Sequence, residues 1–563
     1  MQKGNIGVTT ENIFPIIKKF LYSDHEIFLR ELVSNAVDAT QKLKTLASKG
    51  EFKGEMGDLT IKVSLGKDTI TISDRGIGLT AEEIDKYINQ IAFSGAEEFV
   101  EKYKNDANAI IGHFGLGFYS AFMVAKKVEI ITKSHQEGAQ AVKWTCDGSP
   151  EFTIENVEKE SRGSDIILYI DDDCKEFLEE TRISSLLTKY CRFLPIPIAF
   201  GKKKEWKDGK QVETNEDNVI NETYPLWTRK PVELKDEDYK KFYRELYPMA
   251  DEPLFWIHLN MDYPFNLKGI LYFPKINTQY DNLEGTIKLY NNQVFVADNI
   301  KEVIPEFLML LKGCIDCPDL PLNVSRSALQ NDGFVKKISD YITKKVADKL
   351  SGMYKTHRED YEKYWDDINP FIKFGCLKDL KFLDKMKDFC IYKNLAGKYI
   401  TLPEYLEAGK EKYENKVFYV TDEQAQSQYI NMFKAEGMDA LIMTQTIDSP
   451  FITLLEQKNE NVHFYRIDAE LSDNFVGEEL SEETAKEYKD KLTATFEKAL
   501  DMKNLNVKVE SLKDENTSSI LTQPEETRRM QEMMKMYGMA GMDPSMFGQG
   551  EGETLILNSN NKL

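Results

Sequence analysis

The stretch FLRELVSNAVDA, from Phe28 to Ala39, combines an apolar helical pattern with acid and amide side chains. Glu31, Asn35 and Asp38 stand at positions i, i+4 and i+7, and on an α-helix such positions share one face. Because an unpaired buried carboxylate is costly, these polar residues must either be hydrogen-bonded inside a core or line a cavity. The spacing alone leaves a core network and a functional site about equally favoured.

The composition is typical of a globular protein. The chain has 563 residues, of which 41% are hydrophobic and 30% charged, and this length predicts roughly three to four domains. The longest apolar runs are far shorter than the roughly 20 residues of a spanning helix, and no basic and then apolar signal segment opens the sequence. We therefore expect a cytoplasmic protein without a membrane partner.

Charge and cysteine content argue against a nucleic-acid-binding protein and against a disulfide-stabilised one. The formal net charge is −21, whereas a nucleic-acid groove needs clustered Lys and Arg, so we expect no nucleic-acid partner. The seven cysteines are irregularly spaced and suit a reducing compartment better than a disulfide framework. Cys314 and Cys317 form one CxxC, but without a second pair or a His cluster, two partly buried thiols are favoured over a zinc site by about nine to one.

A β-hairpin is predicted downstream by two alternating runs at 59–65 and 69–73. The second run ends in DRGIG, in which Asp74 supplies an acceptor and the glycines let the backbone approach a flat ligand. Taken alone this motif is weak, and an ordinary strand-to-helix turn is favoured by about two to one. Ser23 with Glu26 predicts a capped helix start before the hairpin, and Thr80 with Glu83 predicts another after it.

A glycine-rich loop, GHFGLG at 112–117, precedes an apolar run at 118–124 that we expect to be helical. Free amides at a helix N-terminus and the helix dipole both favour phosphate oxygens, so the loop predicts an anion site. The glycines do not follow the first strand, which excludes a Rossmann unit, and the GxxxxGK[ST] of a P-loop is missing. A further strand is expected at 165–170, directly after Gly163 and Ser164.

In order and spacing, ELVSNAVDA, DRGIG, GHFGLG and the later Gly163-Ser164 resemble the four motifs of the Bergerat, or GHKL, ATP-binding fold. Longer stretches are similar to the 90-kDa heat-shock chaperone family: FLRELVSNAVDA, IGHFGLGFYSAFMVA, PLWTRKP at 225–231 and DLPLNVSRSALQ at 319–330. The resemblance begins near Glu11 and extends into the C-terminal region. The length of these matching stretches makes chance similarity negligible.

The resemblance implies an α/β multidomain fold. Its expected parts are an N-terminal Bergerat α/β sandwich ATPase domain at 1–205, a charged linker at 206–222, an α/β middle domain at 223–470 and a smaller, helix-rich α+β C-terminal domain at 471–563. The hydrophilic segment 201–223 has few apolar residues and cannot support a core, which favours a linker there. A long solvated hairpin is the alternative.

Residue by residue, the resemblance implies roles for the polar face of the first helix. Glu31 matches the catalytic carboxylate, which would orient or deprotonate the attacking water, and Arg30 matches its partner. Asn35 matches the ligand of Mg²⁺, a post that suits a neutral amide oxygen. ATP with Mg²⁺ is the implied cofactor pair.

The remaining motifs match residues that hold the nucleotide. Asp74 would accept from the adenine amine, with Gly78 and Leu79 as walls, and Ser164 replaces a family threonine that assists Asp74 through its hydroxyl. The other nucleotide-binding residues implied by the match are Asp38, Ala39, Gly112, Gly115, Gly117 and Phe118, of which the last three would cradle the phosphates.

Arg326 in the middle region matches a catalytic residue of the family, and Gln330 could face the same way. Arg326 resembles the arginine that swings into the ATP site to neutralise the γ-phosphate, and Gln330 lies four residues on. Two positions depart from the family pattern. Phe93 stands where the family's lid has a cation, and Ser327 replaces the acidic neighbour of the arginine, so we do not carry those contacts over.

The C-terminal region predicts a surface for client proteins. Seven methionines stand between Met530 and Met546, and Met-rich surfaces are adaptable, although loose core filling or a disordered tail is equally favoured. The family pairs two subunits through further helices beyond LNSNNKL. We therefore expect a truncated C-terminal domain whose homodimer interface is weakened or absent.

The expected function is that of an ATP-dependent molecular chaperone, which binds unfolded or partly folded clients and couples slow hydrolysis to conformational closure. An ATP-independent holdase with a vestigial ATPase site is the alternative. A histidine kinase should carry a phosphoacceptor His in a helix ahead of the fold, and a mismatch-repair relative should carry a basic DNA path. Neither feature is visible in the sequence.

Overall fold

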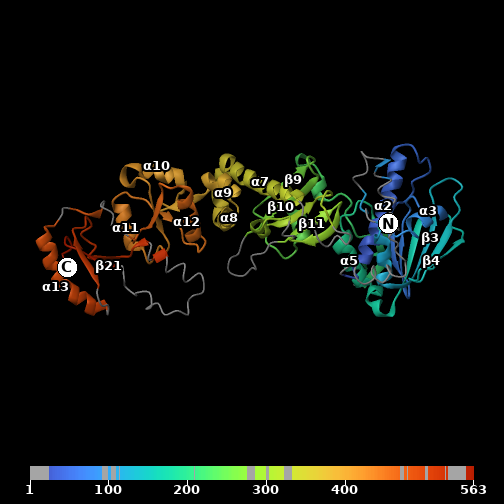
Figure 1. Cartoon of the computed structure of the whole chain (residues 1–563), viewed down its shortest axis with the longest axis horizontal. Coiled ribbons are helices and arrows are strands. Elements are labelled where there is room, and N and C mark those ends of the chain that lie inside the picture. Colours follow the sequence, from blue (N-terminus) through green and yellow to red (C-terminus); the bar gives the residue numbers. More distant parts are fainter. Residues whose placement is uncertain are drawn as a thin grey trace, which may run out of the picture. The chain divides into compact units, whose positions relative to one another are not determined.

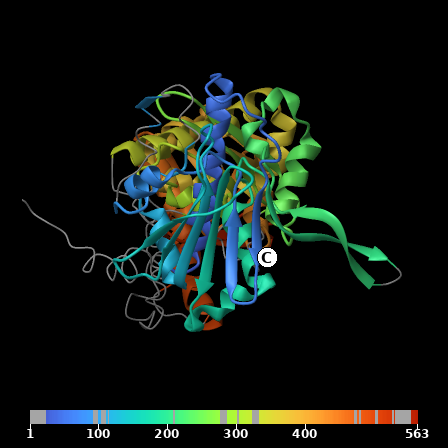
Figure 2. The same ribbon diagram turned by 90° about the vertical axis from the view of Figure 1, so that its right-hand side faces the viewer.

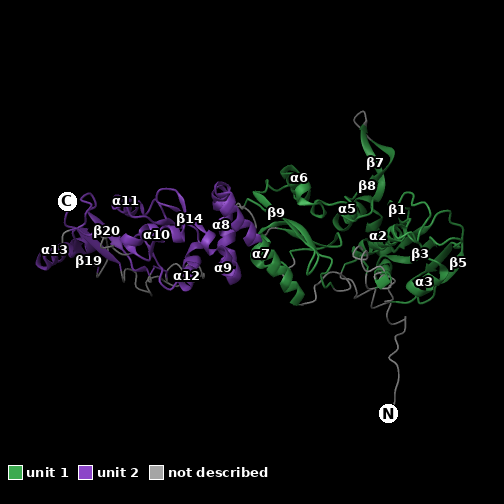
Figure 3. Cartoon of the chain, turned by 90° about the horizontal axis from the view of Figure 1, so that it is seen from above, with its two compact units in different colours: residues 1–345 green, residues 346–563 purple. Residues whose placement is uncertain are grey.

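The computed structural model of the chain divides into two compact units, residues 1–345 and 346–563, which Figure 3 colours separately. Figure 1 labels the helices and strands. The structure describes residues 24–91, 99, 101–102, 110–112, 115–207, 210–275, 286–299, 303–322, 333–469, 475–477, 480–500, 505–525, 528–529 and 553–562.

A mixed sheet of eight described strands forms the N-terminal part of the first unit, and Figure 2 looks onto one of its faces. The strands are β1 (Ile61–Leu65), β2 (Thr69–Ser73), β3 (Ala125–Lys133), β4 (Val142–Cys146), β5 (Thr153–Asn156), β6 (Gly163–Ile170), β7 (Ile198–Lys207) and β8 (Lys210–Val219). Their order is β5-β4-β3-β6-β2-β1-β7-β8. The predicted hairpin is confirmed as β1 and β2, which pair antiparallel with Lys62 opposite Ser73.

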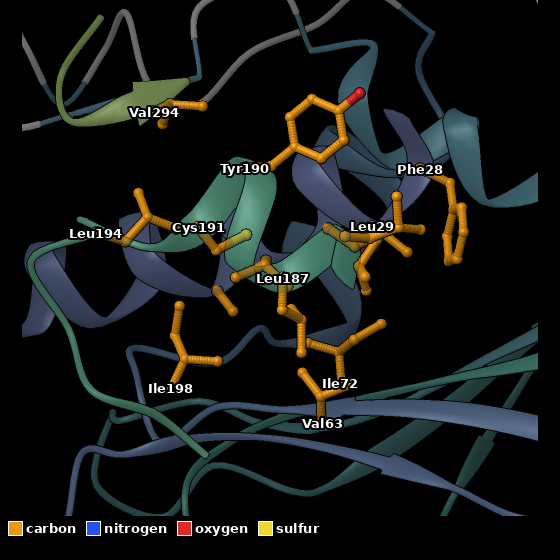
Figure 4. Packing of buried hydrophobic residues seen from close by; sticks show 14 of the residues in the cluster. Phe28, Leu29, Val63, Ile72, Leu187, Tyr190, Cys191, Leu194, Ile198 and Val294 are labelled. Atoms are coloured by element: carbon orange, nitrogen blue, oxygen red, sulfur yellow. The ribbon is translucent and has the colours of Figure 1, made fainter. Parts of the chain in front are cut away.

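Helices cover the face of this sheet that is turned away in Figure 2. The helical segments of this part are α2 (Ile27–Ser48), α3 (Ala81–Tyr87), η3 (Gly117–Met123), η4 (Asp172–Leu178) and α5 (Glu180–Cys191). Leu29 of α2 and Leu187 of α5 meet Val63 and Ile72 of the strands, and each of these side chains is at most 3% exposed (Figure 4). Burying such a side chain contributes about 1.5 to 3 kcal/mol, so this layer fixes α2 on the sheet.

Two predicted helix starts have different outcomes. Thr80 caps α3, because its hydroxyl accepts from the N–H of Glu83 and the Glu83 carboxylate accepts from the N–H of Thr80. The box predicted before α2 pairs Glu26 with Ser23, which lies outside the described residues, so the box stays a prediction. In the structure α2 begins at Ile27, and the Glu26 carboxylate binds Arg182 at 2.7 Å and Lys189 at 2.8 Å. The helix expected at 118–124 is present as the 3₁₀ helix η3.

Much of the segment predicted as a linker lies in the hairpin arm, which consists of β7 and β8 (Figure 3). The linker prediction for 206–222 is therefore wrong, and the solvated hairpin is correct. Cross-strand ion pairs join Lys202 to Asp217 at 2.6 Å and Lys203 to Glu216 at 2.8 Å. Because the first residues of β7 pair with β1 in the main sheet, the arm needs no core of its own.

A second sheet, with the order β12-β11-β13-β10-β9, forms the middle part of the first unit. Its strands are β9 (Phe255–Met261), β10 (Leu267–Phe273), β11 (Ile287–Asn291), β12 (Val294–Asp298) and β13 (Lys312–Asp316), accompanied by η5 (Leu226–Thr228), η6 (Pro231–Glu233), α6 (Asp236–Leu246) and η7 (Glu306–Leu310). Phe193 packs its ring on Trp227 at 4.7 Å and on Tyr290 at 5.6 Å between centroids. The N-terminal and middle parts of this unit therefore share one core.

The second unit carries two further sheets in its described residues, in the orders β15-β14-β17-β16-β18 and β19-β21-β20. The strands are β14 (Ile391–Asn394), β15 (Tyr399–Thr401), β16 (Lys416–Val420), β17 (Leu441–Ile442), β18 (His463–Arg466), β19 (Asn506–Glu510), β20 (Ser519–Thr522) and β21 (Thr554–Asn558). The helices are α7 (Gly333–Thr356), which begins in the first unit, α8 (Arg358–Lys378), α9 (Leu380–Met386), η8 (Lys387–Phe389), α10 (Leu402–Tyr413), α11 (Ser427–Ala435), α12 (Asp448–Lys458) and α13 (Glu482–Leu500).

The multidomain α/β fold class is confirmed, whereas the domain limits at 205, 222 and 470 stay predictions. Among the described residues, helices long and apolar enough to cross a membrane are absent. Cys314 and Cys317 are fully buried free thiols, and burial raises the pKa of Cys317 to about 12.

Candidate functional site

The polar face of α2 lies against the glycine-rich loop. Glu31 and Asp38 are 6% and 7% exposed, and Asn35 between them is half-buried. A Cβ placed on Gly117 would stand 2.8 Å from Glu31 Oε2, and one on Gly112 would stand 3.2 Å from Asp38 Oδ2. The three side chains that the helical spacing placed on one face therefore border the two ends of the predicted anion loop.

Arg30 and Glu31 form a buried ion pair. Arg30 donates from Nε and from one terminal nitrogen to the same carboxylate oxygen, at 3.0 and 2.8 Å. Both side chains are less than 10% exposed, so a charge left without its partner here would be strongly destabilising. The guanidinium keeps the carboxylate of Glu31 in one orientation beside the glycine loop.

Asp38 anchors this loop to the helix. Its two carboxylate oxygens accept from the backbone N–H groups of Ile111 and Gly112, each at 2.8 Å. These bonds occupy both oxygens of Asp38 with protein donors. The geometry therefore gives Asp38 a role in fixing the loop, in addition to the nucleotide contact that the sequence predicts.

Asn35 offers an oxygen ligand of the kind that a magnesium ion prefers. It lies one helical turn after Glu31, and its Oδ1 is 3.7 Å from the Cβ position of Gly112. Mg²⁺ prefers oxygen ligands, and a neutral carboxamide oxygen beside a phosphate loop adds no repulsion toward phosphate oxygens. The residues present therefore fit the ion that the sequence implies.

Asp74 is a buried acid at the end of β2. It is 4% exposed, and its Oδ1 accepts from the N–H of Gly76 at 2.7 Å. Burial raises the pKa of the Asp74 carboxyl to about 7, against the lowering effect of that hydrogen bond. The N–H of Ile77 binds the carbonyl of Ala39 at 3.1 Å, so the DRGIG loop is attached to the C-terminal half of α2.

Thr132 of β3 joins the residues around this acid, and the sequence analysis missed it. Its hydroxyl accepts from the N–H of Leu79 at 2.9 Å and lies 2.9 Å from the hydroxyl of Ser164. Ser164 contacts Asp74 through the backbone, since its carbonyl accepts from the N–H of Asp74 at 2.9 Å. The hydroxyl network therefore runs from Ser164 through Thr132 to the backbone of Leu79, in the loop before α3.

Gly78 shows why the DRGIG loop requires a glycine. Its φ is +61°, and a Cβ there would lie 1.9 Å from the carbonyl oxygen of Lys133. A side chain is excluded on both counts, so the loop lies closely against β3.

The residues of the predicted phosphate loop differ in burial: the glycines are partly accessible, whereas one side chain lies in the core. Gly115 and Gly117 are half-buried, whereas the ring of Phe118 is 7% exposed and packs edge-on against Trp144 and Phe122. Phe118 therefore offers only its backbone to a phosphate. Arg326, Gln330, Phe93 and Ser327 lie outside the described residues.

Comparison with known proteins places this geometry in a family. The family described as Hsp90 protein matches residues 201–563, and the family described as histidine kinase-, DNA gyrase B-, and HSP90-like ATPase matches residues 22–164, which contain α2, Asp74 and the glycine loop. This chain belongs to the Hsp90 family. The residues that the ATPase family matches include the polar face of α2. The chain is an ATP-binding chaperone with an ATPase domain.

Curated Hsp90-family relatives match along the chain. A protein of Bacteroides fragilis named chaperone protein htpG is 61% identical over 100% of this chain and 84% of its own length. The chaperone protein HtpG of Porphyromonas gingivalis is 52% identical over 100% of this chain and 84% of its own length. That of Idiomarina loihiensis is 33% identical over 96% of this chain and 89% of its own length.

Proposed function

We propose that this Hsp90-family chain binds ATP with Mg²⁺ along the polar face of α2, hydrolyses it slowly and couples hydrolysis to a conformational closure. The observation that carries the proposal is the convergence of three motifs on one helix. Glu31 and Asn35 border the glycine loop, Asp38 binds that loop, and the backbone of Ala39 holds the loop of Asp74.

Glu31 is the proposed catalytic carboxylate. Its position beside the glycine loop suits a group that orients the attacking water or accepts its proton, and Arg30 keeps it aimed. Asn35 is the proposed protein ligand of Mg²⁺, which when bound neutralises charge on phosphate oxygens. Arg326 and Gln330 are proposed, on the family resemblance, to complete the site from the middle region.

Asp74 is the proposed reader of adenine. Its free acceptor capacity beside Gly76 and its burial suit a carboxylate that takes a hydrogen bond from an exocyclic amine. Gly78 and Leu79 are proposed to wall the base, with Thr132 and Ser164 holding that wall in place. Gly112, Gly115, Gly117 and the backbone of Phe118 are proposed to contact the phosphates.

Unfolded or partly folded proteins are the proposed clients, in keeping with the chaperone family. We propose that a second copy of the chain is a partner through the C-terminal region, and that sedimentation at increasing concentration will show a monomer–dimer equilibrium. A single monomeric species at all concentrations would contradict this. The cytoplasmic location stays a prediction of the sequence.

Measuring ATP turnover with and without an unfolded client tests the proposal against the holdase alternative. Turnover that requires Mg²⁺, is lost with EDTA and changes when the client is added is the expected result. Arg326→Ala should lower turnover about 10³-fold with nucleotide binding retained. Client protection that is the same with and without ATP, in a protein that does not turn over, would favour the holdase.

A further inference from the structure

The turn between β11 and β12 reaches the nucleotide-binding part of the first unit. Asn292 and Gln293 form this turn with φ angles of +50° and +64°. The side-chain amide of Asn292 donates to the carbonyl of Ile110 at 3.3 Å. The N–H of Gln293 donates to the buried carboxylate of Asp316 at 3.0 Å, which holds the turn to its own sheet. The middle part therefore presents a fixed donor to residue 110.

Ile110 directly precedes the two amides that Asp38 binds. The N–H groups of Ile111 and Gly112 donate to that carboxylate, so Asn292 holds the same short backbone segment from the opposite end of the peptide unit. Displacing Asn292 would remove the contact from the middle part and keep the contact with Asp38. A backbone held from two elements fluctuates less than one held from a single element.

The same hairpin makes a second contact, with Tyr190, whose ring lies beside the partner of the proposed catalytic acid. The ring of Phe295 on β12 lies 6.1 Å from that of Tyr190 on α5, and Figure 4 shows Val294 of the same strand near Tyr190. The guanidinium of Arg30 lies 5.8 Å from the centre of the Tyr190 ring. Since Arg30 binds Glu31, the hairpin is two side chains away from that acid.

We propose that the β11–β12 hairpin is a positioning element of the ATPase site, acting through Asn292 on the loop that Asp38 binds and through Phe295 and Tyr190 on the Arg30–Glu31 pair. This inference rests on the proposed function. It gives the middle part a contact with the ATPase site that is made by residues other than Arg326 and Gln330. Tyr190 and Asn292 act through other residues, so their loss changes the rate of hydrolysis more than the binding of ATP.

Asn292→Gly tests the loop contact, because glycine tolerates the positive φ and removes only the amide. The rate of hydrolysis at saturating ATP should fall about fivefold while the KM changes less than about twofold. Hydrogen exchange at Ile111 and Gly112, measured without nucleotide, should become about fivefold faster. Asn299→Gly is the matched control: this asparagine, at φ +49°, accepts from Ile287 at the other end of the hairpin.

Tyr190→Leu tests the contact with Arg30, and Tyr190→Phe is its conservative control. Leucine removes the ring between Phe295 and Arg30 and should lower the hydrolysis rate about fivefold without weakening ATP binding. Phenylalanine keeps the ring and loses the hydroxyl, which donates to Glu26, so hydrolysis should stay near the wild-type rate.

The outcomes separate the inference from the proposed function. A wild-type protein that binds but never hydrolyses ATP would remove the proposed function. A wild-type protein that turns over, with Asn292→Gly equal to Asn299→Gly in both rate and exchange, would overturn the inference alone. Faster exchange at Ile111 with an unchanged hydrolysis rate would also overturn it, because the hairpin would then hold the loop without serving hydrolysis.

Discussion

The two ends of the candidate site are held in different ways. Around Asp74, the partners that fix the backbone come from neighbouring strands of one sheet and from Ala39 of α2. Thr132 and Ser164 face each other across β3 and β6. Around Glu31, the partners are a side chain on the same helix, a glycine loop, and the β11–β12 hairpin of the middle part acting through Tyr190. The first end is built within the N-terminal part alone, whereas the second depends on elements from two parts of the unit.

This difference assigns the two ends different tasks. A site fixed by sheet hydrogen bonds is already formed before its ligand arrives, which favours affinity. A site whose acid is oriented through contacts from another part responds when that part moves, which favours control over hydrolysis. Variants at the Asp74 end should therefore change binding, and variants at the Glu31 end should change turnover.

Glu31→Ala should give the largest effect. Removing the carboxylate proposed to act on water should lower the hydrolysis rate roughly 10³-fold, while the affinity for ATP changes less than about threefold. Single-turnover hydrolysis and calorimetry measure the two quantities separately. Glu155→Ala removes an exposed glutamate on β5 and serves as the control. Wild-type turnover in Glu31→Ala would contradict the assignment of hydrolysis to the Glu31 end of the site.

Asp74→Asn should show the reverse pattern. Loss of the charged acceptor should lower the affinity for ATP about 100-fold, since hydrogen bonds to charged groups contribute about 1.5 to 3 kcal/mol. The asparagine still accepts from Gly76 through its oxygen, so the loop should keep its conformation. Calorimetry measures the affinity, and an unchanged value would remove the adenine assignment.

The pH dependence of nucleoside binding gives a second test of the Asp74 end of the site. The pKa of Asp74 is raised to about 7 by burial, so the carboxyl takes up a proton as the pH falls through 7. A ligand that needs the carboxylate must then displace that proton, and its affinity should fall by up to about tenfold per pH unit below 7 and level off above it. Adenosine is the probe to titrate, because it has no phosphate of its own that ionises. A flat profile from pH 5.5 to 8 would contradict the assignment.

Thr132→Val should give the smallest effect. Valine keeps the shape but removes the acceptor of the Leu79 N–H and the partner of the Ser164 hydroxyl. The affinity for ATP should fall about threefold to fivefold, as for one neutral hydrogen bond, with turnover at saturating ATP unchanged. A larger loss of turnover than of affinity would show that the two ends are not separable.

Local pattern was enough to predict much of this site. The helix that carries Glu31, Asn35 and Asp38 follows from apolar periodicity, and the hairpin before Asp74 follows from alternation. Both signals depend only on residues close in sequence. The Thr80 capping box was predictable for the same reason.

Contacts between distant residues were not predictable. Thr132 looks like any residue of an alternating strand, and only the antiparallel register of β3 and β6 sets it opposite Ser164. Glu26 has the spacing of a capping residue, but ion pairs with α5 hold its carboxylate. The charged segment at 206–222 lacks a core pattern because the hairpin arm is stabilised by pairing and cross-strand ion pairs rather than by burial.

The aromatic rings that join the N-terminal and middle parts determine how the first unit can be divided. Because Phe193 packs on both Trp227 and Tyr290, a chain cut at residue 205 or 222 loses the rings that cover this side chain. A nucleotide-binding fragment ending there would expose an apolar surface and would therefore self-associate in solution. Heating the intact chain should melt both parts of the first unit in one cooperative step.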